Sequence, residues 1–120
     1  MTRPRGGEPA RAAGTMRLVV LHVPDCPNTV VLESRLAAIL ASRPDIHITR
    51  TVIRTEDQAR QQGMAGSPTL LLDGRDPFAR PGQQPSLSCR LYPGDEGRPG
   101  PAPSAQQLLT ALATPHTQED

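Results

Sequence analysis

One apolar run near the start of the chain constrains the fold most. Residues 16–23 read M-R-L-V-V-L-H-V, and Pro24 ends the run. A short strand that is apolar on both faces must be covered on both faces, as in the central strands of α/β proteins. Only 36% of the 120 residues are hydrophobic, which suffices for one domain with a small core. We therefore expect a single α/β domain with helices on both faces of a sheet built around this strand.

The other periodic segments alternate between helix and strand. Pro27 suits a first helical position, and Leu32, Leu36 and Ile39 follow it at helical spacing. The expected elements are, in order, strand 16–23, helix 27–42, an edge strand 46–53, a short helix that starts at the capping box Thr55 to Gln58 and ends at Gly63, strands 69–72 and 87–92, and a last helix from a second capping box, Ser104 to Gln107.

This order, β-α-β-α-β-β-α, predicts a mixed four-stranded sheet. The two βαβ crossovers imply parallel pairing with right-handed connections, and the last two strands are expected to pair antiparallel. The domain spans residues 16–113, with long loops rich in proline and glycine at 75–86 and 93–103. Residues 1–15 and 114–120 are expected to be flexible tails.

Composition excludes several classes of function. The net charge is +1 with mixed signs, and Phe78 and Tyr92 are the only aromatic residues, so we expect no nucleic-acid partner. No apolar run approaches the roughly 18 to 20 residues of a membrane span, and residues 1–15 contain no apolar segment of a secretory signal. We therefore expect a cytoplasmic protein without a membrane partner. Two cysteines in such a chain are more often reduced, catalytic or metal-binding than a structural disulfide, and they are too few for a four-ligand zinc site by themselves. No metal or cofactor is predicted.

The stretch V-P-D-C-P-N, residues 23–28, places a cysteine between the first strand and the first helix. If Pro27 is the first helical residue, Cys26 is the N-cap, and its sulfur faces the free N–H groups and the positive end of the helix dipole. Both features lower a thiol pKa and favour the nucleophilic thiolate. Asp25 opposes this effect as a neighbouring carboxylate, but it is also a candidate proton donor or acceptor. In the alternative interpretation, Asp25 is the cap, or Cys26 is simply a small N-cap residue.

Two motifs carry a resemblance to thioredoxin-like proteins. One is V-P-D-C-P-N, and the other is G-S-P-T, residues 66–69, which places a proline just before the third strand. In that superfamily the proline is typically cis and lies against the reactive cysteine. The segments G-S-P-T-L-L-L-D-G-R-D-P-F-A and S-L-S-C-R-L-Y also resemble short bacterial proteins, common in actinobacteria, that are labelled thioredoxin-family or alkylmercury-lyase-like. The resemblance spans residues 16–113 and implies a thioredoxin-like fold.

The chain departs from the two-cysteine thioredoxin motif at Thr29, which stands where the second cysteine would be. The resemblance therefore implies a one-cysteine design that resembles monothiol glutaredoxins and peroxidases with Thr or Ser near the thiol. Cys26 is then the nucleophile, and Asp25 and Thr29 are candidate catalytic neighbours.

The resemblance also implies a substrate-binding segment made of Ser67, Pro68 and Thr69. Pro68 would keep the chain from closing over the sulfur. It would also leave the Ser67 backbone free to pair with an extended substrate.

Cys89 has two interpretations. It alternates with Leu87 and Leu91, which predicts a buried strand cysteine. Alternatively, Cys89 is a distant resolving cysteine, which requires Cα atoms within about 7 Å of each other. The simple strand order opposes this pairing, because it places the fourth strand beyond the third, away from the first.

Two smaller features complete the candidate site residues. The segment D-G-R-D-P-F, residues 73–78, is expected to be a turn, or alternatively a loop that shapes the Cys26 site. His22 is expected to be structural rather than a metal ligand paired with Cys26.

Three functions remain open from the sequence. The first is a thiol oxidoreductase that uses Cys26 on a thiol or disulfide substrate, either a protein or a small molecule. The second is handling of a soft metal or an organomercurial by Cys26 and Cys89, with Asp25 or Asp76 as the proton donor. The third is a non-catalytic binding module that uses the groove at Pro68. The sequence does not fix the oligomeric state.

Overall fold

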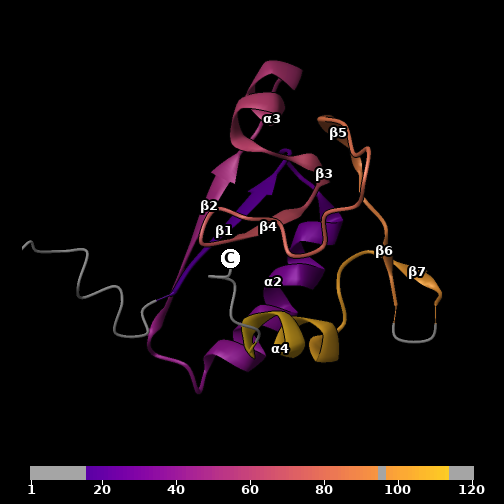
Figure 1. Ribbon diagram of the computed structural model, residues 1–120. Coiled ribbons are helices and arrows are strands. Elements are labelled where there is room, and N and C mark those ends of the chain that lie inside the picture. Colours follow the sequence, from indigo (N-terminus) through magenta and orange to yellow (C-terminus); the bar gives the residue numbers. More distant parts are fainter. Residues whose placement is uncertain (1–15, 95–96, 114–120) are drawn as a thin grey trace, which may run out of the picture.

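A computed structural model describes residues 16–94 and 97–113 (Figure 1). Its elements are β1 (Met16–His22), α2 (Pro27–Leu40), β2 (Ile46–Val52), α3 (Glu56–Gln62), β3 (Ala65–Ser67), β4 (Thr69–Leu72), β5 (Ser86–Cys89), β6 (Tyr92–Pro93), β7 (Pro99–Gly100) and α4 (Ala105–Ala113). The predicted tails at 1–15 and 114–120 lie outside the described residues.

The main sheet is mixed, with the strand order β2-β1-β4. β1 pairs parallel with β2 and antiparallel with β4. The parallel first crossover is therefore confirmed, and the parallel second crossover is wrong. The contacts of Ser67 show where the chain turns back. Its hydroxyl accepts from the Val23 N–H just after β1, and Thr69 lies opposite Leu21. β4 therefore starts at the end where β1 finishes and runs back.

The predicted fourth strand does not join this sheet. In the described part of the chain the main sheet has three strands, so the four-stranded prediction is wrong. β5 instead pairs parallel with β3, and β6 forms a separate two-stranded sheet with β7. The expected antiparallel pairing of β4 with β5 is therefore also wrong, because β5 pairs with β3. The α/β class and the mixed character of the sheet are confirmed.

Helices α2 and α4 cover one face of the main sheet. Leu18 and Val20 of β1 pack with α2 and α4 in the larger core cluster. Leu21 points to the other face and packs in a smaller cluster with Ala59 of α3. Figure 1 shows α4 beside α2 at one side of the sheet and α3 beyond the end of β2. On this second face Leu21 is buried but Val19 is only partly buried, so the helices cover one face of β1 fully and the other near its end.

The predicted helix starts are confirmed by their caps. Thr55 and Gln58 form a reciprocal capping box at α3, and Gly63 ends that helix in the left-handed conformation (φ 91°). Ser104 and Gln107 exchange hydrogen bonds of 3.0 Å at the start of α4. These side chains pair N–H groups that a helix start leaves without an intrahelical partner.

The segment 93–103 is more structured than the predicted linker or surface loop, although residues 95–96 lie outside the described residues. It contains the β6–β7 hairpin, and Ala102 is buried in the larger core cluster. Arg35 of α2 donates from Nη1 to the carbonyls of Ala102 (3.0 Å) and Pro103 (2.9 Å). The segment therefore packs against α2 before α4 begins.

Candidate thiol site

Cys26 lies at the junction that the sequence predicts. It is the N-cap of α2, with extended backbone angles (φ −81°, ψ 113°) and Pro27 as the first helical residue. The alternative in which Asp25 caps the helix is therefore wrong. Asp25 instead turns the chain in a left-handed conformation (φ 58°) that Asp adopts more readily than most residues. Its side chain is exposed, whereas Cys26 is only 6% exposed.

The surroundings of Cys26 favour its thiolate. Burial is the largest influence and raises the pKa of the thiol. Hydroxyl groups of Ser67 and Thr29, together with the backbone N–H groups of Thr29 and Asn28, act in the opposite direction. Their combined effect prevails, so the pKa of Cys26 lies below its ordinary value. Although the sulfur makes no cap hydrogen bond of ordinary geometry, the start of α2 still contributes to this lowering through its free amides.

Thr29 lies three residues after Cys26 in the sequence. It lies in the first turn of α2 and is 5% exposed. Its hydroxyl is buried and has no hydrogen-bond partner of ordinary geometry in the part of the chain that the structure describes. The same hydroxyl interacts with the Cys26 sulfur and lowers its pKa. An unpaired buried hydroxyl is costly, so its position beside a thiol points to the site rather than to the core.

Ser67 links the thiol to the neighbouring strands. It is fully buried, and its hydroxyl oxygen accepts a hydrogen bond of 3.0 Å from the Val23 N–H in the β1–α2 connection. Since that oxygen acts as an acceptor from Val23, its own O–H remains able to donate to the Cys26 sulfur. The Ser67–Pro68 peptide bond is cis, which confirms the expectation for Pro68.

The Ser67 backbone is not free, contrary to the prediction. Its carbonyl oxygen accepts a hydrogen bond of 2.9 Å from Arg90 N–H, directly after β5. β3 and β5 pair in parallel, and Ser67 lies opposite Cys89. The chain's own strand thus takes the place that was expected for an extended substrate.

Cys89 is exposed, so the prediction of a buried strand cysteine is wrong. The alternation along 87–92 has the opposite orientation: Arg90 and Tyr92 are 6% and 2% exposed, whereas Leu91 is 59% exposed. Hydrogen bonding explains this inversion. A buried polar side chain is stable when its donors are paired, and both of these are paired.

Arg90 and Tyr92 are site-supporting residues that the sequence did not reveal. Arg90 Nη1 donates to Asp76 Oδ2 at 2.8 Å, and its Nη2 donates to the Phe78 carbonyl at 2.8 Å. Its guanidinium lies 4.5 Å from the centre of the Tyr92 ring. The Tyr92 hydroxyl donates to the Pro68 carbonyl at 2.6 Å. Burial raises the pKa of Tyr92, so the hydroxyl keeps the proton that this bond requires.

Thr69 belongs to this network rather than to an open substrate surface. Its hydroxyl accepts from Arg90 Nη1 (3.1 Å) and donates to the Gly66 carbonyl (2.7 Å). Thr69 and Pro68 are buried, and their part in substrate binding stays a prediction. The loop that carries Asp76 does shape this region, because Asp76 holds Arg90, and the predicted Asp73–Gly74 turn precedes it.

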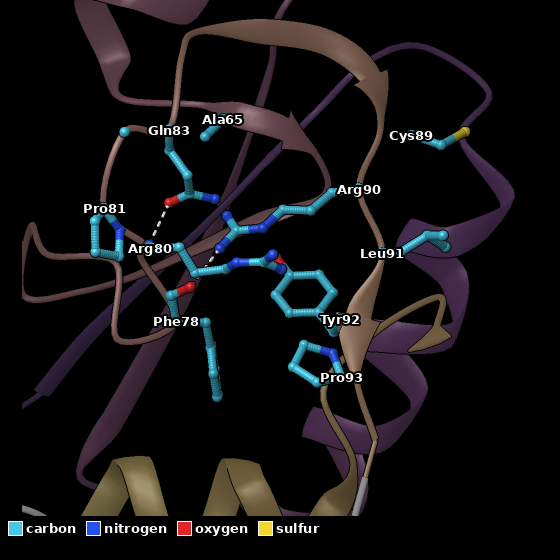
Figure 2. Close-up of a pocket in the computed structure, with 11 residues that line it drawn as sticks. Ala65, Phe78, Arg80, Pro81, Gln83, Cys89, Arg90, Leu91, Tyr92 and Pro93 are labelled. Atoms are coloured by element: carbon cyan, nitrogen blue, oxygen red, sulfur yellow. Dashed lines mark hydrogen bonds between the residues drawn. The ribbon is translucent and has the colours of Figure 1, made fainter. Parts of the chain in front are cut away.

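A pocket of about 370 Å³ adjoins the site (Figure 2). Its lining includes Arg80, Gln83, Tyr92 and Cys89. In Figure 2 the Cys89 side chain points away from Arg90 and Tyr92, and its sulfur is directed toward the purple segment that leads into α2. Cys89 therefore borders the pocket, with its sulfur turned away from Arg90 and Tyr92.

Within residues 16–94 and 97–113, no group of three or more His, Cys, Asp and Glu residues could hold a metal ion. His22 Nδ1 lies 2.9 Å from the carbonyl oxygen of Val23 and makes a hydrogen bond there, and its structural role stays a prediction. Among the described helices, none has the length and apolar character needed to cross a membrane.

Comparison of the chain with protein-family models, curated proteins and solved structures gives no match.

Proposed function

We propose that this protein is a thioredoxin-like, thiol-dependent oxidoreductase whose nucleophile is Cys26. The observation that carries the proposal is the placement of a cysteine at the start of α2, between two hydroxyl groups that stabilise its thiolate. The strand order β2-β1-β4 supports the fold assignment, with the thiol after β1 and Ser67-Pro68 before β4.

The chemistry follows from the lowered thiol pKa. A thiolate attacks one sulfur of a disulfide, forms a mixed disulfide with it, and releases the other sulfur as a thiolate. The Ser67 and Thr29 hydroxyls and the first amides of α2 hold negative charge on Cys26 before the attack. Asp25 is adjacent and exposed, and it can exchange protons with solvent and the leaving thiolate.

The pH dependence of alkylation tests the proposal. In the Cys89→Ser variant, Cys26 is the only thiol, and we expect iodoacetamide to modify it with a midpoint below the free-thiol value of about 8.5. The same variant in denaturant is the control, because unfolding removes the hydroxyls and amides from the sulfur. The midpoint is compared rather than the absolute rate, since Cys26 is nearly buried. A folded midpoint at or above the denatured one would refute the proposal.

The two alternative functions find less support. In the organomercurial hypothesis Asp25 or Asp76 donates a proton. The Asp76 carboxylate is paired with Arg90 and also accepts from the Phe78 N–H at 2.8 Å, which leaves Asp25 as the donor. A binding module needs an open groove beside Pro68, but β5 occupies the Ser67 backbone there.

A further inference from the structure

β5 lies where an extended substrate would pair with the thiol site. The Ser67 carbonyl, which an incoming strand would use, accepts from Arg90 N–H. Ser86 N–H, at the start of β5, donates to the Met64 carbonyl at 3.2 Å. Both ends of β5 are therefore bound to the segment around β3, and the strand presents its own cysteine at the position opposite Ser67.

An irregularity in the β3–β5 pairing places Cys89 at that position. Ala65 lies opposite Ser86 and Ser67 lies opposite Cys89, so two steps along β3 correspond to three steps along β5. The additional residue is a β-bulge, which changes the direction of the side chains that follow it. Without it, Ser88 would lie opposite Ser67, and Cys89 would point to the other face.

Ser67 is paired with Cys89 on one side and is bonded to the segment before Cys26 on the other, so both cysteines lie near it. Residues opposite each other in neighbouring strands are about 5 Å apart and share a face. The Ser67 side chain on that face accepts from Val23 N–H, three residues before Cys26. Cys89 is exposed, and its sulfur is directed toward the β1–α2 connection in Figure 2.

We propose, on the basis of the function proposed above, that Cys89 is the resolving thiol of Cys26, and that the oxidants are low-molecular-weight disulfides rather than extended polypeptides. Two observations exclude an extended polypeptide from the site as it stands. The Ser67 backbone is already paired with β5, and only 6% of Cys26 is exposed. A small disulfide has no backbone to pair, so it does not need the position that β5 occupies.

The reaction balances with no further reactant. The Cys26 thiolate attacks the disulfide RSSR, forming Cys26–S–SR and releasing RS⁻. The Cys89 thiolate then attacks the Cys26 sulfur, forming the Cys26–Cys89 disulfide and releasing the second RS⁻. The two protein thiols lose two electrons and two protons, and RSSR becomes two RSH. A bond between the cysteines needs Cα atoms within about 7 Å, which the placement of both beside Ser67 favours.

The test uses the full reduced chain and hydroxyethyl disulfide as the oxidant. For the wild type we expect two equivalents of mercaptoethanol per chain and a Cys26–Cys89 link in non-reducing peptide maps. The Cys89→Ser variant should release one equivalent and retain a stable mixed disulfide on Cys26. If the wild type also retains the mixed disulfide, the resolving role is refuted while the proposed function stands. If Cys26 forms no mixed disulfide in either protein, the proposed function itself fails.

A matched variant tests the register. The double substitution Ser88→Cys with Cys89→Ser keeps one thiol on β5 but moves it by one residue, away from the position opposite Ser67. We expect release of the second thiol to slow by at least about tenfold relative to the wild type, because a misplaced reacting group loses most of its intramolecular advantage. Equal rates in the two proteins would overturn the inference that the bulge presents Cys89 to Cys26.

Discussion

At the scale of single residues, removal of the Thr29 hydroxyl should change the reactivity of Cys26 without lowering the stability of the fold. It is buried without a partner of ordinary geometry among the described residues, yet it helps to lower the pKa of Cys26. Thr29→Val removes the hydroxyl and keeps the branched shape. We expect the free energy of unfolding to stay unchanged or rise by about 1 kcal/mol, since an unsatisfied buried group is removed. The pKa of Cys26 should rise, because one group that stabilises the thiolate is lost.

Urea unfolding and the alkylation midpoint, both measured in the Cys89→Ser background, check this prediction. Ser67→Ala is the comparison, because it removes a thiolate-stabilising hydroxyl that also accepts from Val23 N–H. That variant should raise the Cys26 pKa as well, but it should also lose about 1–2 kcal/mol of stability. A Thr29→Val protein that is less stable and has an unchanged midpoint would show that the hydroxyl serves the fold alone.

The sequence predicts the position of Cys26 correctly, but not how Ser67 and Cys89 pair, for a physical reason. Pro27 fixes the start of α2 locally, and Cys26 follows as the N-cap whatever the rest of the chain does. The orientations of Ser67 and Cys89 depend on pairing between strands that are far apart in sequence. No local pattern around either residue encodes that register.

At the scale of elements, the close approach of β3 and β5 rests on Gly66. Gly66 has φ +100°, and a Cβ built on it would lie 2.8 Å from the Arg90 Cβ. We expect Gly66→Ala to destabilise the fold by about 1–2 kcal/mol for the backbone conformation and by about 1–3 kcal/mol more for the steric clash. The displaced β5 should also slow formation of the Cys26–Cys89 link. Thermal unfolding and thiol release with hydroxyethyl disulfide measure the two effects.

Gly82→Ala is the matched control for this prediction. Gly82 also has a positive φ (+79°), but nothing lies within 4 Å of an added Cβ. It should show the backbone cost without the clash, and its thiol release should match the wild type. Equal losses of stability in the two variants would mean that β5 moves away from Gly66 at no cost.

The sequence predicts the elements that local signals determine and not those that depend on residues far apart in the chain. Capping boxes and the continuous apolar run act within a few residues, so α3, α4 and β1 were predicted correctly. Which side chains of 87–92 are buried depends on Asp76, which lies in the loop before β5 and pairs with the buried Arg90. Because Arg is rarely buried unless paired, alternation alone assigned Arg90 to the solvent. That assignment placed Cys89 in the core.

At the scale of the whole molecule, the thiol site couples to the stability of the fold through protons. Burial raises the pKa of Cys26. The hydroxyls of Ser67 and Thr29 and the amides at the start of α2 together lower it by more than burial raises it, so the pKa of the folded protein is below that of the unfolded chain. Between these two values the unfolded chain holds a proton that the folded chain has lost. Stability therefore rises with pH across this window, and the added stability is lost as pH falls through the folded pKa.

We expect the difference in free energy of unfolding between wild type and Cys26→Ser to change with pH between the folded and the unfolded pKa of Cys26. With both proteins kept reduced, the difference should shift in favour of the wild type as pH rises toward the unfolded value of about 8.5, and then level off. Cys26→Ala should give the same trend with a different constant offset, because neither substituted side chain ionises in this range. Urea unfolding at a series of pH values measures it. A difference that moves against the wild type as pH rises would mean that burial prevails, and that Cys26 is an inert thiol in the core of the protein.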